Sequence, residues 1–402
     1  MGAVAALGLW AAGAADLPDR AFPRVVVATV VASVGGSLEL SGDAGALAET
    51  HAGITVMPLS VTLTGALTVA AGFLHPLRRA AVRPGEAAWW AARIALLWAA
   101  ALVGLSFAAR QTFAVDLGSG VLGALSDLFG AEPRVGFAAQ APLTVLFGLL
   151  WLLGVLAVAL LVTREAPLPS RLLRGRRAAR PVAYAMVALL LAYVVVGLVA
   201  ALVTAGVRGR PEQTFALVLL GLPNLAWLAL TLGMGAAWNG RVDGPFGLPV
   251  PHLLDEVLRT PDVSTLTVGT LAEHDGRAWW LVPVAAVLLT GAGALAAALS
   301  PPRTPLWRHA LRMAAGLLLT VLAVCLVGRI SAHYALSLLG IGDAGGGLSG
   351  EVLLRPRLWG AISLAALWGL VTGFLGGWLA RLTGLTGRRG AERSGPSAAS
   401  GP

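Results

Sequence analysis

Hydrophobic residues in this chain gather in long uninterrupted runs, and polar residues are confined to the segments between them. A helix rises about 1.5 Å per residue, so about 20 apolar residues cross a hydrocarbon core about 30 Å thick. Eight runs have that length, and they lie at 54–75, 87–109, 141–163, 182–206, 214–238, 278–299, 310–329 and 358–380. The pattern predicts eight membrane-spanning helices.

Two shorter runs precede these eight. The run 2–15 ends before Asp16 and has no Lys or Arg in front of it, which argues against a secretory signal peptide. We expect it to be either part of an incomplete first span or a half-inserted helix. The run 25–38 follows Pro23 and Arg24, and it fits both a tilted span and a re-entrant hairpin.

The predicted fold class is all-α, a polytopic transmembrane helix bundle with about eight to ten membrane segments. Residues 1–380 form a single transmembrane helical domain in this interpretation. Residues 381–402 are rich in Arg, Gly, Ser and Pro, and we expect them to form a disordered basic tail.

Composition excludes a water-soluble protein and argues against nucleic-acid binding. Charged residues make up 12% of the chain, against about 25% in soluble domains. The net charge of +9 comes from arginine alone, and the arginines cluster in short loops between apolar runs, where membrane topology accounts for them. Cys325 is the single cysteine, so no internal disulfide can form.

Arginine is distributed unequally between two sets of connecting segments. One set holds 16 arginines and three glutamates, and it comprises 76–86, 164–181, 300–313 and the tail. The other holds seven arginines and 14 acidic residues, and it comprises 37–53, 110–140, 239–277 and 330–357. By the positive-inside rule the first set is cytoplasmic, which predicts a plasma-membrane protein with a cytoplasmic C-terminus. The strongest topology determinants are Arg171, Arg174, Arg176, Arg177 and Arg180.

The number of runs conflicts with this orientation. An even number of crossings must separate the predicted cytoplasmic segments 164–181 and 300–313, but three runs lie between them. In the run 214–238, Pro223 removes a backbone donor and Asn224 places a polar group at mid-depth. We therefore predict a broken or re-entrant helix there, with a hidden partial span in 239–277 as the alternative.

A layout of apolar helix, Arg-rich turn and second apolar helix occurs three times. The blocks open with PLSV at 58–61, PLTV at 142–145 and VPVA at 282–285. QTFA closes the first two, at 111–114 and 213–216, and residues 333–335 form a third candidate equivalent. Repeats are common in membrane transport folds, but so biased a composition also produces such matches by chance.

The most polar predicted external segment, 239–277, carries the candidate chemistry. If PHLLDEVLR (251–259) is helical, His252 and Glu256 share one face at a spacing that can hold a metal, and Asp255 and His274 complete the cluster. No HExxH motif, Cys pair, Ser-centred nucleophile motif or phosphate-binding glycine loop accompanies them. We accordingly predict no catalytic residue, no metal and no cofactor.

Small side chains recur at every fourth position on two runs. They are Ala365, Gly369, Gly373 and Gly377 on the last run, and Ser60, Thr64, Thr68 and Gly72 on the first. Such stripes let helix backbones approach closely in lipid. They predict packing within the chain, with a homo-oligomer through these faces as the alternative.

Membrane lipids are the other expected partners. Trp238, Trp279, Trp280, Trp307 and Trp359 fall at run ends, as expected of an interfacial belt.

Four segments resemble the streptophobe family, very hydrophobic multi-pass proteins of actinobacteria. They are GLWAAGAADLP (8–18), MPLSVTLTGALTVAAGFLHPLR (57–78), GLPNLAWLALTLGMGAAW (221–238) and DGRAWWLVPVAAVLLTGAG (275–293). The resemblance implies a plasma-membrane location and a longer N-terminus, and it implies no reaction, substrate or site residue.

Three classes of function stay open. The first is a non-enzymatic membrane scaffold or envelope-associated protein. The second is a transporter or lipid-handling permease with a midplane path near 214–238, and the third is an intramembrane enzyme that uses 239–277. Ion and proton carriers need ionisable groups at depth, and the runs contain almost none, so we favour the scaffold.

Overall fold

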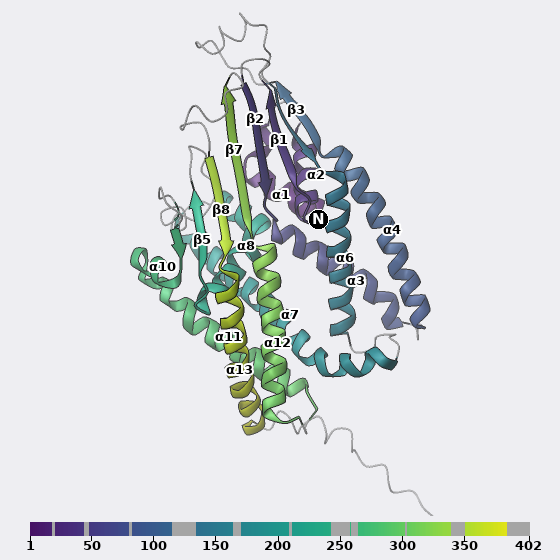
Figure 1. The fold of residues 1–402 in the computed structure, drawn as a ribbon, viewed down its shortest axis with the longest axis vertical. Helices are drawn as coiled ribbons and strands as arrows, with labels where there is room; N and C mark the ends of the chain where they lie inside the picture. Colours follow the sequence, from purple (N-terminus) through teal and green to yellow (C-terminus); the bar gives the residue numbers. More distant parts are fainter. Residues whose placement is uncertain are drawn as a thin grey trace, which may run out of the picture.

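The computed structural model of the chain describes residues 1–17, 21–43, 48–79, 83–114, 134–163, 170–208, 211–242, 258, 264–301, 304–338 and 350–383. Within these residues the dominant architecture is a helix bundle (Figure 1). The α-helices are α1 (Gly2–Ala11), α2 (Phe22–Ala32), α3 (Leu59–Arg79), α4 (Pro84–Ala108), α6 (Ala141–Val162), α7 (Ser170–Arg208), α8 (Pro211–Gly233), α10 (Val268–His274), α11 (Leu281–Leu299), α12 (Leu306–Val327) and α13 (Leu358–Leu382), with short 3₁₀ helices at Ala14–Asp16 and Gly276–Trp280.

Eight of the described helices are long and apolar enough to cross a membrane, which confirms the predicted polytopic helix bundle. They are α3, α4, α6, α7, α8, α11, α12 and α13. The two shorter N-terminal runs also form helices, α1 and α2, of 10 and 11 residues. At about 1.5 Å per residue these two are too short to cross a hydrocarbon core about 30 Å thick.

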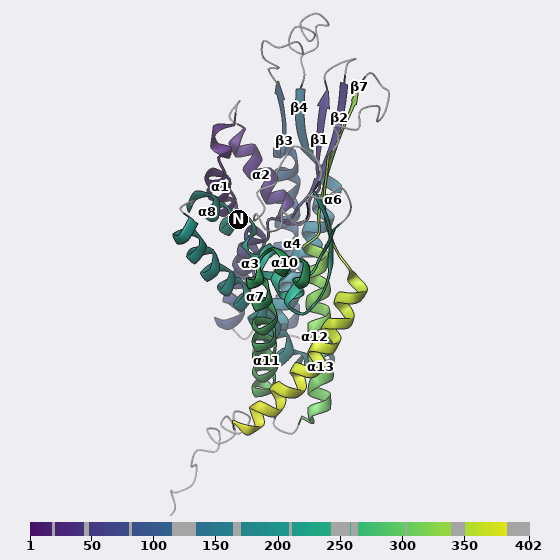
Figure 2. The ribbon, with the colours of Figure 1, turned by 90° about the vertical axis from the view of Figure 1, so that its left-hand side faces the viewer.

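The structure adds an antiparallel sheet that the sequence analysis did not predict. Its strands are β1 (Leu38–Asp43), β2 (Ala48–Thr55), β3 (Arg110–Ala114), β4 (Arg134–Ala139), β5 (Trp238–Val242), β6 (Ser264–Leu266), β7 (Ile330–Leu338) and β8 (Gly350–Pro356). They pair in the order β3-β4-β1-β2-β7-β8-β5-β6. Figure 2 shows this sheet rising from one end of the bundle, which we call the sheet end.

The opposite end, which we call the loop end, joins α3 to α4, α6 to α7 and α11 to α12, and α13 also finishes there (Figure 1). The described parts of the segments richest in arginine therefore lie together at one end of the bundle. Arg381 and Leu382, the first two residues of the predicted tail, belong to α13. Residues 384–402 lie outside the described residues.

The strand order reveals a tandem repeat of two halves. In the first half, α2 leads through the β1-β2 hairpin to α3, and α4 leads through the β3-β4 hairpin to α6. The second half repeats this plan: α8 leads through the β5-β6 hairpin to α11, and α12 leads through the β7-β8 hairpin to α13. The sheet order β3-β4-β1-β2 is then repeated as β7-β8-β5-β6, and the β2-β7 pairing joins the halves.

Local geometry supports this equivalence. Both α2 and α8 are followed within three residues by a glycine in the left-handed region, Gly35 (φ 92°) and Gly235 (φ 90°), and the chain then enters β1 or β5. In each turn a 6→1 backbone bond closes the helix, from Gly36 to Val31 in one half and from Ala236 to Thr231 in the other.

The backbone contacts between the paired hairpins also correspond. Gln140 donates its backbone N–H to the carbonyl of Ser37 in the first half, and Arg357 donates to the carbonyl of Ala237 in the second. Both donors stand directly before the helix that follows the hairpin, α6 or α13.

The repeat differs from the three-block layout suggested by the sequence. PLSV at 58–61 and VPVA at 282–285 are equivalent, because they open α3 and α11. PLTV at 142–145 opens α6, which corresponds to α13 instead. QTFA is a strand at 111–114 but lies within α8 at 213–216, so identical letters occupy different structures.

The predicted break in the run 214–238 is absent, because α8 continues through Pro223 without interruption. This helix starts three residues after α7 and ends beside α11, where a Cβ on Gly233 would lie 2.5 Å from the carbonyl oxygen of Leu281. Its middle contacts Leu59, the first residue of α3. These contacts are at the sheet end of the bundle. For the alternative span within 239–277, the described residues 264–266 and 268–274 form β6 and the short helix α10, and residues 243–257 and 259–263 lie outside the described residues.

Buried apolar residues form one large core and one smaller core in the bundle. The large core joins α7, α8, α11, α12 and α13 to strands β5 and β8, and its fully buried members include Trp238, Leu289, Met313 and Leu317. The smaller core lies between α3, α4 and α6 around Phe73 and Leu152. Two further small clusters attach α1 and α2 to the bundle.

Candidate functional site

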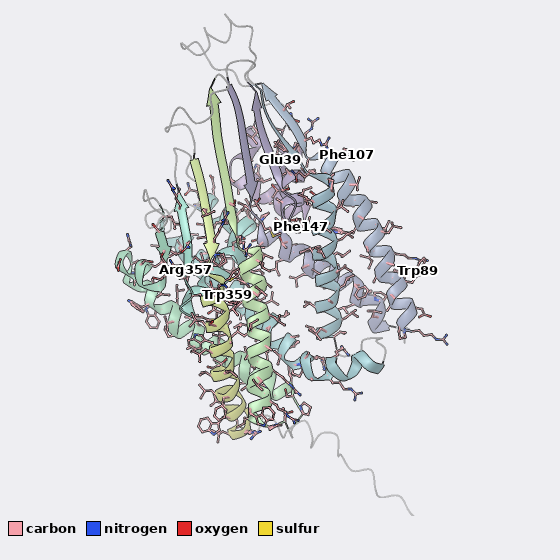
Figure 3. All side chains as sticks on the ribbon, in the orientation of Figure 1. Glu39, Trp89, Phe107, Phe147, Arg357 and Trp359 are labelled. Atoms are coloured by element: carbon pink, nitrogen blue, oxygen red, sulfur yellow. The ribbon has the colours of Figure 1, made fainter. Side chains whose placement is uncertain are left out.

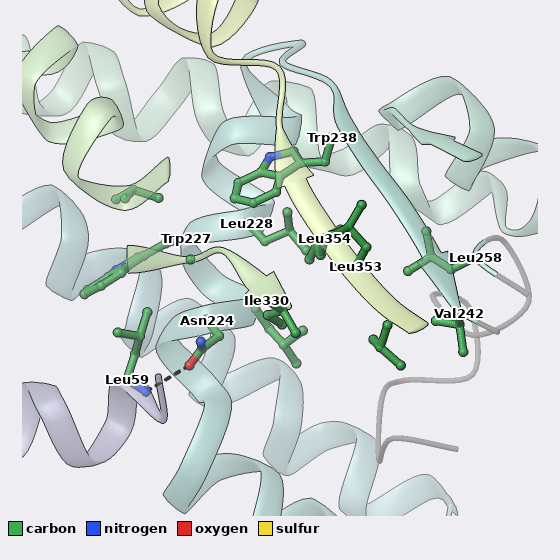
Figure 4. A pocket seen from close by; sticks show the side chains of 14 residues that line it. Leu59, Asn224, Trp227, Leu228, Trp238, Val242, Leu258, Ile330, Leu353 and Leu354 are labelled. Atoms are coloured by element: carbon green, nitrogen blue, oxygen red, sulfur yellow. Dashed lines mark hydrogen bonds between the residues drawn. The ribbon is translucent and has the colours of Figure 1, made fainter. Parts of the chain in front are cut away.

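Asn224 of α8 links the middle of that helix to the start of α3 (Figure 4). Its side-chain oxygen accepts a hydrogen bond from the backbone N–H of Leu59 at 3.0 Å, and its side-chain nitrogen donates to the carbonyl of Met57 at 2.9 Å. The first N–H groups of a helix have no partner within the helix, so Asn224 caps α3 from a distant part of the chain. Ser60 strengthens the contact by donating to the carbonyl of Val218 at 2.8 Å.

Beside Asn224 lies a cavity of about 60 Å³, which we call the junction cavity. It lies between α8 and the strands β5, β7 and β8, and its lining residues are Leu59, Asn224, Leu225, Trp227, Leu228, Trp238, Val242, Leu258, Val324, Gly328, Ile330, Val352, Leu353 and Leu354. Figure 4 shows these mostly apolar side chains around it.

The junction cavity offers little polar chemistry. Asn224 is the only amide side chain in its lining, and both ends of that amide bond backbone groups. Leu59 begins α3 and Gly328 follows the end of α12, so the cavity lies at the span ends and not at the midplane. Its volume is well below the roughly 300–1,000 Å³ of sites for drug-sized ligands. An apolar lining of this kind can hold a small apolar group.

The residues of the predicted external cluster are only partly described. His252, Asp255 and Glu256 lie outside the described residues. His274 ends α10, is exposed, and places Nδ1 3.0 Å from the carbonyl oxygen of Thr270 in the same helix. Within the described part of the chain, no three His, Cys, Asp or Glu side chains come together as a group that could hold a metal.

The arginine cluster of α7 has a structural role that the sequence analysis did not assign. Arg176 is 9% exposed and donates from Nε to the carbonyl of Leu160 at 2.9 Å and from Nη2 to that of Thr163. Arg180 donates to the carbonyl of Val162 at 3.2 Å. The two guanidinium groups thus bond carbonyls that the end of α6 leaves free.

The other three arginines of that cluster have no described hydrogen bond to α6. Arg177 is exposed, and Arg171 and Arg174 lie on α7 with side chains outside the described set. Only part of the predicted topology signal is therefore engaged in side-chain contacts that the structure describes.

The glycine stripe of α13 packs against helices of the same chain. A Cβ on Gly369 would lie 2.5 Å from Cα of Ala314, and one on Gly373 would lie 2.9 Å from Cα of Ala310. Gly377 faces the side chains of Leu306 and His309, and all these partners lie on α12. The neighbouring Gly376, which the stripe did not include, lies against the backbone of α11.

The stripe of α3 behaves differently. Thr64 and Thr68 donate to carbonyls four residues earlier in their own helix, and Gly72 has no other part of the described structure within 4 Å of a Cβ position. Ser60 alone of the four forms a hydrogen bond to another helix.

Tryptophan placement needs one correction. Trp279, Trp280, Trp307 and Trp359 are exposed, as expected of an interfacial belt. Trp238 is instead 1% exposed, and its indole N–H donates to the hydroxyl of Thr231 at 3.0 Å. It begins β5 and fills the large core, because the chain turns into the sheet at this position instead of leaving a span.

A comparison with protein-family models, curated proteins and solved structures found no match to this chain. The eight long apolar helices in the described part of the chain are those of a multi-pass integral membrane protein.

Proposed function

We propose that this chain is a non-enzymatic membrane scaffold that holds an ordered β-sheet at the membrane surface for an envelope partner. The observation that carries the proposal is the joining of the four hairpins in the described part of the chain into one sheet at one end of the bundle. Antiparallel sheets readily present one face to solvent. Such a platform, built from every hairpin, suits a binding surface.

The roles of the buried basic side chains favour a scaffold over a carrier of ions or protons. Among the described residues, the buried basic side chains are Arg176 and His309. Each bonds a backbone carbonyl: Arg176 at the end of α6, and His309 at Gly293, with 3.1 Å between Nε2 and the carbonyl oxygen. Carriers of ions or protons use such groups along their path, whereas these two hold helices together.

A lipid-handling permease is the second candidate. Two observations favour it: the tandem repeat, which is frequent among transporters, and the placement of α8 and β5 next to a cavity. In this proposal α8 and β5 form a re-entrant hairpin, and α2 and β1 form its counterpart. The apolar lining of the junction cavity would then contact an acyl chain.

We also propose a bacterial plasma membrane, with the loop end and the C-terminus in the cytoplasm, and membership of the streptophobe family. The arginines at the described helix ends of the loop end, among them Arg83, Arg176, Arg308 and Arg381, support the orientation. The multi-pass apolar architecture fits the family.

Photo-crosslinking in the native host tests the scaffold. A benzophenone amino acid replaces Thr112 on β3 or Arg355 on β8, two exposed positions on different hairpins, and controls replace lipid-facing Leu96 or Leu367. We expect both sheet positions to give an adduct with the same protein, which the controls lack. Equal adducts at sheet and control positions would reject the scaffold.

Thiol accessibility of the junction cavity separates the two candidates. Leu353→Cys in a Cys325→Ala background places one thiol in the cavity lining. A scaffold predicts a thiol protected from membrane-impermeant reagents at the loop end. A permease predicts that reagents reach it from both ends in turn.

A further inference from the structure

A second hollow lies at the corresponding place in the other half of the repeat. It is an open groove of about 300 Å³ between α2 and the β3-β4 hairpin, and we call it the arginine groove. Its lining residues are Arg24, Arg110, Gln111, Thr112, Gly136, Phe137 and Ala138. The junction cavity lies between α8, β7 and β8, which are the equivalents of α2, β3 and β4.

The two hollows have diverged in chemistry. Arg24 and Asn224 both lie 11 residues before the left-handed glycine that follows their helix, which is Gly35 after α2 and Gly235 after α8. The second half therefore has the amide of Asn224, which bonds backbone groups, at the position where the first half has the guanidinium of Arg24. The junction cavity has an almost wholly apolar lining, whereas the arginine groove contains two arginines and no carboxylate.

Both guanidinium groups in the groove are held by neighbours. Arg24 donates from Nη1 to the side-chain oxygen of Gln111, which is 9% exposed and fixed on β3. The guanidinium carbon of Arg110 lies 5.0 Å from the centre of the Phe107 ring, a cation–π distance. Each arginine thus has a defined position before any ligand binds.

The nearest acidic side chain by strand register is Glu39. It pairs with Ala138, which in turn pairs with Arg110. Its carboxylate accepts a hydrogen bond from the side-chain nitrogen of Gln140, at the start of α6, and it does not line the groove.

The arginine groove lies at the edge of the apolar part of the bundle. Ala108 is the last residue of the α4 span, and Arg110 follows two residues later. Phe107 is 60% exposed, and Figure 3 labels it at the sheet end of α4, opposite Trp89. Arg110, two residues beyond the end of this span, therefore lies at the level where lipid headgroups begin.

We propose that the arginine groove binds the phosphate of an anionic phospholipid headgroup from the leaflet at the sheet end. The planar guanidinium forks of Arg24 and Arg110 match phosphate oxygens and carry permanent positive charge. Free phosphate shares this chemistry, but the level of the groove places a lipid phosphate beside it. This assignment is independent of the proposed scaffold function.

Native mass spectrometry of the full chain released from nanodiscs tests the site. The nanodiscs contain phosphatidylglycerol and phosphatidylcholine, and the variants are Arg24→Gln/Arg110→Gln and, as a matched control, Arg355→Gln on exposed β8. A basic residue near the surface contributes about 1 kcal/mol, so we expect about thirtyfold weaker phosphatidylglycerol retention in the double variant. The control should match the unaltered chain.

Further measurements distinguish a lipid phosphate from free phosphate and identify variants that misfold. Inorganic phosphate is added to the unaltered chain to test displacement of the lipid. Each single variant is measured beside the double variant. Burial of Cys325 shows whether each variant is folded. A fivefold loss in each correctly folded single variant supports the site. Equal retention in all variants, an equal loss in Arg355→Gln, or displacement of lipid by millimolar phosphate alone would overturn it.

Discussion

Single polar residues decide how the helices of this protein are joined. Asn224 attracts notice in the sequence as a polar residue next to a proline, which predicts a helix break. In the structure its amide instead bonds Met57 and Leu59, far away in the chain, and α8 stays continuous. The sequence identified the right residue but not its role, because its partners are set by packing between the two halves.

Arg176 illustrates the same point, and it yields a prediction at the residue scale. Arg176→Gln removes a buried guanidinium from the carbonyls at the end of α6. A hydrogen bond to a charged group contributes about 2 kcal/mol, so we expect a clearly lower apparent Tm in detergent. Reaction of Cys325 with a maleimide reports unfolding, since this single cysteine is buried.

Arg177→Gln is the matched control for Arg176→Gln. It removes the same charge from the next position, which is exposed, and should leave the apparent Tm within experimental error. If the two variants lost equal stability, the effect would come from charge and not from the bonds to α6.

At the scale of elements, α13 shows what a small-residue stripe does in this bundle. The sequence indicates close helix contact through Gly369, Gly373 and Gly377, and in the structure these glycines lie against α12. It does not indicate Gly376, which contacts α11. A helix wedged between two neighbours needs small residues on two faces, and the second neighbour is unknown until the bundle is assembled.

Gly376→Ala tests that contact. The new Cβ would lie 2.4 Å from the backbone nitrogen of Ala294, so the helices must separate. Overpacking costs about 1–3 kcal/mol, and more where backbone must move, so we expect a lower apparent Tm in the Cys325 assay. Gly360→Ala, on the same helix with open space around it, should be neutral or slightly stabilising.

The strands show why elements at the sheet end were missed. β1 and β3 are five or six residues long and contain Gly, Ser, Thr or Arg, so no strong apolar alternation marks them. The strand β3 pairs with β4 across 20 or more residues of chain, and β1 pairs both with β2 and with β4 of another hairpin. Strand formation here depends on pairing over long sequence distances, which a local pattern cannot reveal.

For the whole molecule, the placement of α8 bears on the conflict in the number of crossings. Because 164–181 and 300–313 are both predicted to be cytoplasmic, an even number of crossings must separate them, but three apolar runs lie between them. A topology in which both ends of α8 stay on the sheet side would leave two crossings, α7 and α11. The arrangement of α8 is thus consistent with the arginine distribution.

Cysteine labelling tests this topology. In a Cys325→Ala background, Glu212→Cys and Arg277→Cys flank the α8 region, and Pro301→Cys marks the loop end; all three positions are exposed. We expect an impermeant maleimide to label 212 and 277 from the same side of the membrane and 301 from the other. Labelling of 212 and 277 from opposite sides would make α8 a crossing helix.

The sequence by itself determined that this protein lies in lipid, and it located most of the helices. Crossing a membrane requires runs of about 20 apolar residues, and such runs are a local feature of the chain. It also located the close-packed face of α13 and the unusual run at Pro223. Tertiary structure alone decided the eight-stranded sheet, the two-fold repeat and the paired hollows of opposite chemistry. These features depend on which distant segments meet, and long-range pairing and packing set them.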